Sequence, residues 1–310
     1  MQIKKTLSKT GRLLKDTFIG FIDDNAIKLA ASLSYYTIFA LPPLLIVIIS
    51  LCGIFLGKDA VRGEIFGQIN GLVGNEAALQ IQNIIKNVKL NSDNVFAATV
   101  GVITLLIGAS GVFGEIQGSI NSIWGLKAKP KRGVMKFLKN RLMSFSMIGS
   151  MGFLLLVGLI VNSAMDLLDQ RLALRFPQFT IDAFYVINLL IVYGIITSLF
   201  CVIFKTLPDG KVALKDALIG SSITAFLFML GKFAIGAYLG RSSISSTYGA
   251  AGSVILVLLW VYYSAIILYF GAEFTKVYSH LYGSKIIPND YAVQVKTTEK
   301  EVEPKVVNHD

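Results

Sequence analysis

The stretch Gly249–Val277 reads GAAGSVILVLLWVYYSAIILYFGAEFTKV, and its first charged residue is Glu273. A helix that crosses the hydrocarbon core of a bilayer needs about 20 mainly apolar residues, which this stretch supplies. The chain carries six such blocks, at about 29–56, 95–120, 144–165, 183–206, 214–239 and 249–277. Because backbone polar groups in hydrocarbon must be satisfied internally, each block is predicted to be a helix. The sequence therefore predicts an all-α, polytopic integral membrane protein with six transmembrane helices.

The overall composition leads to the same class of protein. Of 310 residues, 54% are hydrophobic and only 15% are charged, and the mean hydropathy is +0.65. Soluble domains usually carry about 25% charged residues. This composition excludes a disordered chain, which needs low hydrophobicity and high net charge. It also argues against an ordinary soluble enzyme of this length.

Basic residues are distributed unevenly between alternate loops. They concentrate in the N-terminal segment, in the loop after the second block, in the loop after the fourth block and in the tail. The loop after the second block is the richest, with Lys127, Lys129, Lys131, Arg132, Lys136, Lys139 and Arg141. By the positive-inside rule these segments face the cytoplasm, so both termini are predicted to be cytoplasmic. This placement accounts for the net charge of +10, and no nucleic-acid partner is expected.

The segments outside the six blocks have patterns of their own. In residues 1–28, apolar side chains recur at helical spacing among basic ones, which predicts an amphipathic helix on the anionic leaflet; a solvated basic arm is the alternative. The outer loop 57–94 shows two further amphipathic patterns and is expected to hold two short helices. Residues 287–310 are polar and charged, and we expect a disordered cytoplasmic tail. The transmembrane domain is thus placed at 29–286.

Three stretches, Leu29–Gly57, Leu105–Gly133 and Leu207–Tyr278, resemble the YihY/virulence factor BrkB family of bacterial inner-membrane proteins, once labelled ribonuclease BN. The third stretch is the most specific and begins LPDGKVALKDALIGS. The resemblance implies a multi-pass protein of the bacterial cytoplasmic (inner) membrane with six helices. It does not supply an established activity.

Pro42 and Pro43 lie halfway along the first block. Each lacks a backbone N–H, so the helix is expected to break there. Broken helices near the middle of the membrane are typical of transporter binding sites. Tyr35 and Tyr36 lie one to two turns before the break and could line it. The alternative is a packed structural kink.

Three ionisable residues lie within or at the margins of the apolar blocks: Glu115, Lys232 and Glu273. A charge at the centre of a membrane helix costs about 2.5–3.5 kcal/mol on insertion scales, so such residues usually have a role. Glu115 is the strongest functional candidate. The structural alternatives are that Lys232 extends toward the outer surface, and that Glu273 lies at headgroup level beside Lys276.

The segment 240–252, GRSSISSTYGAAG, is predicted to be an outer hairpin entering the sixth block. It offers Arg241, several hydroxyl groups including Tyr248, and the free N–H groups of a helix N-terminus, which bind anions. With Lys232 it would form a cationic outer vestibule. Close helix packing at its small residues is the alternative.

The enzyme hypothesis has little support. The chain has two histidines, His280 and His309, and lacks GxSxG, HExxH and P-loop motifs. No catalytic, cofactor-binding or metal-binding residues are predicted, although a two-metal site of Glu115, Asp209 and Asp216 is conceivable. We therefore expect a protein that is not an enzyme.

The resulting hypothesis is a transporter or translocator of an anionic amphiphile, a lipid or a small anion through a polar cavity in the bilayer. The alternatives are a membrane scaffold that organises a partner complex through the loop 127–141 and, with less support, a ribonuclease. A homo-oligomer is compatible with each of these.

Overall fold

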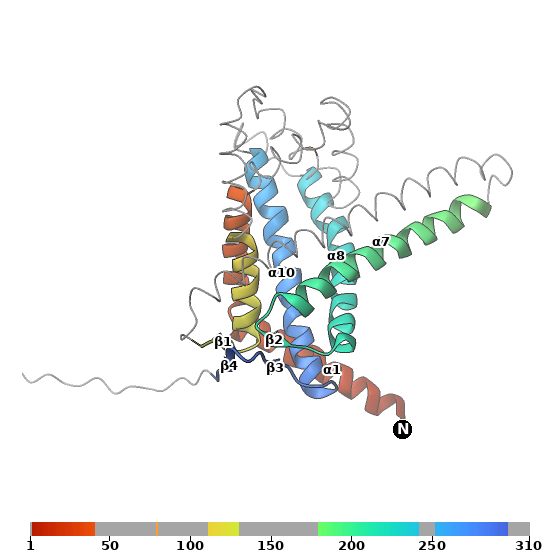
Figure 1. Ribbon diagram of the computed structural model, residues 1–310. Coiled ribbons are helices and arrows are strands. Elements are labelled where there is room, and N and C mark those ends of the chain that lie inside the picture. Colours follow the sequence, from red (N-terminus) through yellow and green to blue (C-terminus); the bar gives the residue numbers. More distant parts are fainter. Residues whose placement is uncertain (1, 41–78, 80–110, 130–178, 242–251, 297–310) are drawn as a thin grey trace, which may run out of the picture.

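The computed structural model describes residues 2–40, 79, 111–129, 179–241 and 252–296. These residues are mostly helical, with four short strands gathered at one end of the helices (Figure 1). Within these ranges three helices are long and apolar enough to cross a membrane: α7 (Phe179–Thr206), α8 (Leu214–Arg241) and α10 (Gly252–Leu281). They correspond to the predicted fourth, fifth and sixth blocks, but α7 begins before residue 183, α8 ends after residue 239 and α10 continues beyond residue 277.

The first two predicted blocks are described only in part. Residues 26–40 and 111–123 are helical, as predicted for the parts of those blocks that they cover. The remainder of both blocks and all of the third lie outside the described residues. The two short helices predicted in 57–94 also lie outside them, apart from Leu79.

The N-terminal segment forms the helix α1 (Gln2–Asp23), as predicted, whereas its place on the anionic leaflet stays a prediction. Leu13, Thr17 and Phe21 are buried at a spacing of four, and α1 packs on α10. The neighbouring Phe18 and Ile22 remain exposed. The helix therefore has two apolar faces, one against the protein and one facing outward.

The chain turns sharply between α1 and the helix 26–40. Asn25 has a φ of 53°, in the left-handed region that asparagine tolerates better than most residues. Its side-chain amide donates to the Asp23 carbonyl at 3.3 Å. This turn ends α1 and redirects the chain into the bundle.

Helices α8 and α10 pack through a reciprocal pair of glycines and threonines. A Cβ added to Gly220 of α8 would lie 1.9 Å from the hydroxyl oxygen of Thr275 on α10, and one added to Gly271 of α10 would lie 1.9 Å from that of Thr224 on α8. Each threonine hydroxyl donates to the glycine carbonyl four residues earlier in its own helix. The hydroxyls are thus satisfied locally, and the small glycines allow the close approach that membrane helices need.

The main apolar core draws on all the described helices and lies toward the strands. It includes Ala30 of helix 26–40, Ile120 of helix 111–123, Phe204 of α7, Ala217 of α8 and Tyr269 of α10. Helix α7 packs on α8, and its N-terminal half runs obliquely away from α8 and α10 (Figure 1).

Two small antiparallel sheets connect loops that are far apart in sequence. Strand β1 (Leu126–Ala128) pairs with β4 (Ala292–Gln294), and β2 (Gly210–Lys211) pairs with β3 (Ile287–Pro288). We call this end of the molecule, where α1 and the strands lie, the strand end (Figure 1).

The prediction of a disordered tail from residue 287 is wrong for residues 287–296. Backbone ladders to β1 and β2 hold this part, Ile286 and Ala292 are buried, and the Val295 N–H donates to the Gly125 carbonyl at 2.7 Å. Gly125 has a φ of 64°, and a Cβ there would lie 2.9 Å from the Val295 carbonyl oxygen. Residues 297–310 lie outside the described part.

Candidate functional site

The loop between α7 and β2 places a carboxylate, Asp209, in the interior at the strand end, where it is only 2% exposed. Its two oxygens accept hydrogen bonds from the side-chain amides of Gln117 and Asn121, each at 3.0 Å. The Asp209 N–H donates to the Asn121 side-chain carbonyl at 2.8 Å. Gln117 and Asn121 are four residues apart and so lie on one face of helix 111–123. This face fixes the loop against the helix.

Tyr291 of the tail joins the same cluster. The Asn289 N–H donates to the Asp209 carbonyl at 2.9 Å, and the Asn289 side-chain amide donates to the Tyr291 hydroxyl at 3.2 Å. Burial and the nearby Asp209 carboxylate both raise the pKa of the Tyr291 phenol. The cluster therefore keeps the tyrosine protonated beside the carboxylate.

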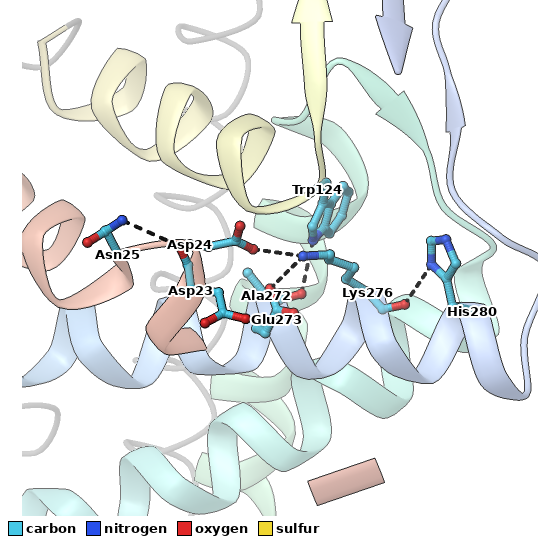
Figure 2. Close-up of polar contacts among 8 residues, drawn as sticks. All are labelled: Asp23, Asp24, Asn25, Trp124, Ala272, Glu273, Lys276 and His280. Atoms are coloured by element: carbon cyan, nitrogen blue, oxygen red, sulfur yellow. Dashed lines mark hydrogen bonds and ion pairs between the residues drawn. The ribbon is translucent and has the colours of Figure 1, made fainter. Parts of the chain in front are cut away.

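A second polar group joins α10 to the turn after α1. The Lys276 ammonium lies between two carboxylates, 2.7 Å from Asp24 and 3.1 Å from Glu273 (Figure 2). Glu273 is 1% exposed, and a Cβ on Gly20 of α1 would lie 2.1 Å from its Oε1. The indole N–H of Trp124 donates to the Ala272 carbonyl at 2.9 Å on the same helix. The buried Glu273 carboxylate needs a cationic partner such as Lys276, because moving a charge out of water is costly.

Asp216, in the first turn of α8, has a structural role at the end of α10. Its carboxylate accepts from the Ser284 N–H at 2.9 Å and from the Ser279 hydroxyl at 3.3 Å. A Cβ on Gly283 would lie 2.2 Å from the same carboxylate. These hydrogen bonds satisfy the Ser284 N–H and the Ser279 hydroxyl where the chain leaves α10.

A different situation exists where helix 111–123 faces α10, on the same segment of helix 111–123 that carries Gln117 and Asn121. The hydroxyls of Ser119 and Tyr269 are buried and neighbour each other, but neither has a hydrogen-bond partner of normal geometry within the described part of the chain. Glu115 lies one turn before Ser119 and interacts electrostatically with Tyr269. At 1.5 Å per residue, Tyr269 lies about 18 Å from the Leu281 end of α10. We call Glu115, Ser119 and Tyr269 the mid-bundle site.

Some of the predicted site residues come together here. A Cβ on Gly111 would lie 3.3 Å from the ring of Tyr36, and Gly111 is one helical turn from Glu115. Tyr36 thus lies on the side of helix 111–123 that carries Glu115. Tyr35 is exposed and packs against the ring of Phe39.

Other predicted site residues lie elsewhere or are not described. Lys232 is partly buried on α8, next to Gly231, which contacts Tyr263 of α10. Glu273 lies about 15 Å further along α10 than Tyr263, in its own ion pair. Arg241 is the last residue of α8, and its side chain is not described. Pro42, Pro43 and Tyr248 lie outside the described residues.

The described residues contain no group of three or more histidine, cysteine, aspartate or glutamate side chains that could hold a metal ion. Asp209 and Asp216, considered above as metal ligands, instead accept the amide and hydroxyl hydrogen bonds already described.

Sequence analysis missed Asp24, Ser119 and Tyr269 as parts of polar sites, and it considered Asp209 only as a conceivable metal ligand, without its amide partners. Lys276 and Asp24 are separated by 252 positions, so no local pattern could pair them. Asp209 lies within the stretch LPDG, where its position after a proline marked a loop but did not indicate burial. Ser119 and Tyr269 become notable only once their burial is known.

Long apolar helices packed through glycine, with buried carboxylates at one end, define a helical membrane protein. The virulence factor BrkB family model matches residues 17–291, and the chain belongs to this family. It is a membrane protein, and its relatives place it in bacteria.

Relatives named "UPF0761 membrane protein" match most of the chain. The protein of Saccharophagus degradans is 30% identical over 277 residues, which cover 88% of this chain and 61% of the relative. That of Teredinibacter turnerae is 29% identical, with the same two coverages. The chain thus spans about three fifths of the length of these relatives. The protein of Cronobacter sakazakii is 29% identical over 88% of this chain and 91% of its own length. No solved structure matches the chain.

Proposed function

We propose that this protein is a six-helix transporter of the bacterial inner membrane that moves an anionic amphiphile or a small anion through a polar passage beside helix 111–123. Both termini, and therefore the strand end, face the cytoplasm. The protein is not an enzyme; any transport is passive or coupled to a gradient. The positive-inside distribution of Lys and Arg supports this orientation.

The observation that carries the proposal is the mid-bundle site. A polar group buried without a hydrogen bond costs on the order of 1–3 kcal/mol, and the interior of a membrane offers no bulk water to compensate it. A water or a ligand beside Ser119 and Tyr269 would satisfy both hydroxyls. The nearby Glu115, an ionisable residue in an apolar block, is the kind of residue that marks ion and substrate pathways.

The two predicted halves of the passage have different charges. Glu115 supplies a carboxyl group in the bundle, and Lys232 and Arg241 supply positive charge toward the predicted outer side. An anion that enters from the outer side would meet this positive charge first. A cleft lined by charges of one sign attracts a substrate of the opposite sign. Tyr36 lies beside Gly111, one helical turn before Glu115 on the same helix.

Flux measurements in reconstituted vesicles test the proposal. The probes are fluorescently labelled phosphatidylglycerol, followed by chemical quenching of the outer leaflet, and chloride, followed by an entrapped dye. We expect at least one probe to move faster than in protein-free vesicles. Glu115→Gln and Tyr269→Phe should each lower that flux by about tenfold or more, as expected when an interaction along the pathway worth about 1.4 kcal/mol or more is lost.

Tyr278→Phe is the matched control, because it removes a phenol hydroxyl at the end of α10 where Tyr278 stacks on Phe274. It should leave flux unchanged. If neither probe moves, or if Tyr278→Phe and Tyr269→Phe behave alike, the transport proposal is wrong. A stoichiometric partner that copurifies with a flux-inactive protein would favour a scaffold instead.

A further inference from the structure

An apolar groove of about 390 Å³ lies between α1, α8 and α10. Phe18 and Phe21 of α1 form one wall, and Leu227 and Leu230 of α8 form another. Tyr263 and Phe270 of α10 lie at the back. Its volume falls within the range of ligand pockets, about 300–1,000 Å³.

This groove is separate from the mid-bundle site. Phe270 and Tyr269 are consecutive on α10, so their side chains point about 100° apart around the helix. Phe270 faces α1 and packs edge-on against Phe21, with 5.7 Å between ring centroids. Tyr269 is completely buried on another face, near helix 111–123. The groove therefore lies apart from the proposed passage.

The outward wall of the groove indicates where the occupant comes from. Phe18 and Leu230 are 58% and 54% exposed, which is unfavourable in water for side chains of this size. In a membrane protein such side chains face lipid, so the groove opens to the acyl chains of the bilayer. A single apolar chain fits this lining, whereas a polar solute does not.

Positive charge lies beside the same wall of the groove. Lys15 is three residues before Phe18 and thus on the same side of α1. Lys15 is exposed, and neither it nor Lys9 forms an ion pair within the described ranges. Arg12 is 3.5 Å from Asp16, so one acidic group of this helix is already neutralised.

We propose that the groove binds one acyl chain of an anionic phospholipid from the surrounding bilayer, whose phosphate is held by Lys15 and Lys9 of α1. The lipid fixes α1 on the membrane surface by occupying both its apolar and its basic face. Binding requires no movement of lipid across the membrane, so this inference does not depend on the proposed transport.

Native mass spectrometry of the full-length protein in detergent tests the headgroup. Phosphatidylglycerol and phosphatidylcholine with identical acyl chains are the two probes. We expect the wild type to retain phosphatidylglycerol several-fold more than phosphatidylcholine. Lys15→Gln should reduce that preference about fivefold, the effect of one basic residue near a lipid surface. Lys28→Gln, which removes the same charge from an exposed site on helix 26–40, should leave it unchanged.

A second pair of variants tests the groove itself. Ala234→Phe places a ring into the groove, where Ala234 is part of the lining, and should reduce retention of both lipids at least fivefold. Ala237→Phe adds the same ring to an exposed position of α8 outside the lining and should have no effect. If Ala234→Phe lowers the melting temperature, Leu230→Asn replaces it, since a polar wall should also expel the chain.

Three results would overturn the inference. The wild type would retain the two lipids equally, or the two lysine variants would have equal effects, or neither groove variant would retain less lipid than Ala237→Phe. None of these results bears on the flux measured with Glu115→Gln. The failure of lipid binding and the failure of transport can therefore be distinguished.

Discussion

Asp209 illustrates how a buried carboxylate can be held by amide groups on one helix face. Hydrogen bonds to a charged group contribute about 1.5–3 kcal/mol each, and two side-chain amides donate to Asp209 at 3.0 Å. If the carboxylate is removed, Gln117 and the Asn121 amide group lose their acceptor in the interior. The loop before β2, the tail and helix 111–123 would then lose the group that joins them.

Asp209→Ala is therefore expected to lower the free energy of unfolding by on the order of 3 kcal/mol. Thermal unfolding of the purified protein in detergent, followed by fluorescence, measures the effect. Asp290→Ala is the control, because Asp290 is exposed and its contact with Lys129 uses the backbone carbonyl. Equal melting temperatures for the two variants would show that the Asp209 cluster does not stabilise the fold.

Tyr291 gives this cluster a pH dependence. Burial and the Asp209 charge raise the pKa of its phenol above the usual value of 10.0. Between about pH 10 and the raised pKa the unfolded chain loses this proton while the folded protein keeps it, so the free energy of unfolding falls as pH rises. Tyr291→Phe should flatten this fall. Melting temperatures of both proteins, measured from about pH 8 to pH 11, check the prediction; parallel curves would contradict it.

The helices and the strands differ in how well the sequence predicts them. The limits of α7 and α8 follow from long apolar blocks that begin and end at polar residues, so the sequence predicts them closely. Strands of two or three residues, such as β2 and β4, are too short to show an alternating pattern. The tail was therefore predicted to be disordered, although 287–296 pairs with two loops.

The packing of α8 on α10 depends on the reciprocal glycines. Gly271→Ala is expected to destabilise the protein by about 1–3 kcal/mol, the usual cost of overpacking, because the new methyl group would overlap Thr224. Gly236→Ala is the matched control on α8, where nothing lies within 4 Å of the added Cβ. Thermal unfolding in detergent compares them. A melting temperature for Gly271→Ala as high as that for Gly236→Ala would refute the close helix approach.

At the scale of the whole molecule, the sequence predicted which segments lie at the same end of the helices. The loop after the second block, the loop after the fourth block and the tail were placed together from their basic residues. The pairing of β1 with β4 and of β2 with β3 brings these three segments to the strand end. The distribution of basic residues could predict that these segments lie together, because this distribution sets the orientation of membrane helices.

The candidate site was only partly predictable, because it depends on packing as well as on the pattern of charges along the chain. Glu115 was identified because a charge in an apolar block is visible in the sequence. Ser119 and Tyr269 are common residue types in membrane helices, and their importance depends on burial without partners, which is a property of packing. The proximity of Lys276 to Glu273 was foreseeable from their spacing of three, whereas the contribution of Asp24 was not.

The central claim is that water or a solute reaches the mid-bundle site, and the accessibility of Ser119 tests it most directly. Cys52 and Cys201 are first replaced by alanine, and Ser119→Cys is then treated in vesicles with a charged, membrane-impermeant thiol reagent. Ser221→Cys is the control, since Ser221 is buried on α8 and its hydroxyl is bonded to the Ala217 carbonyl. Thiols react as thiolates, which form only where water or charge stabilises them. The account predicts labelling at position 119 and protection at position 221; equal protection at both positions would contradict it.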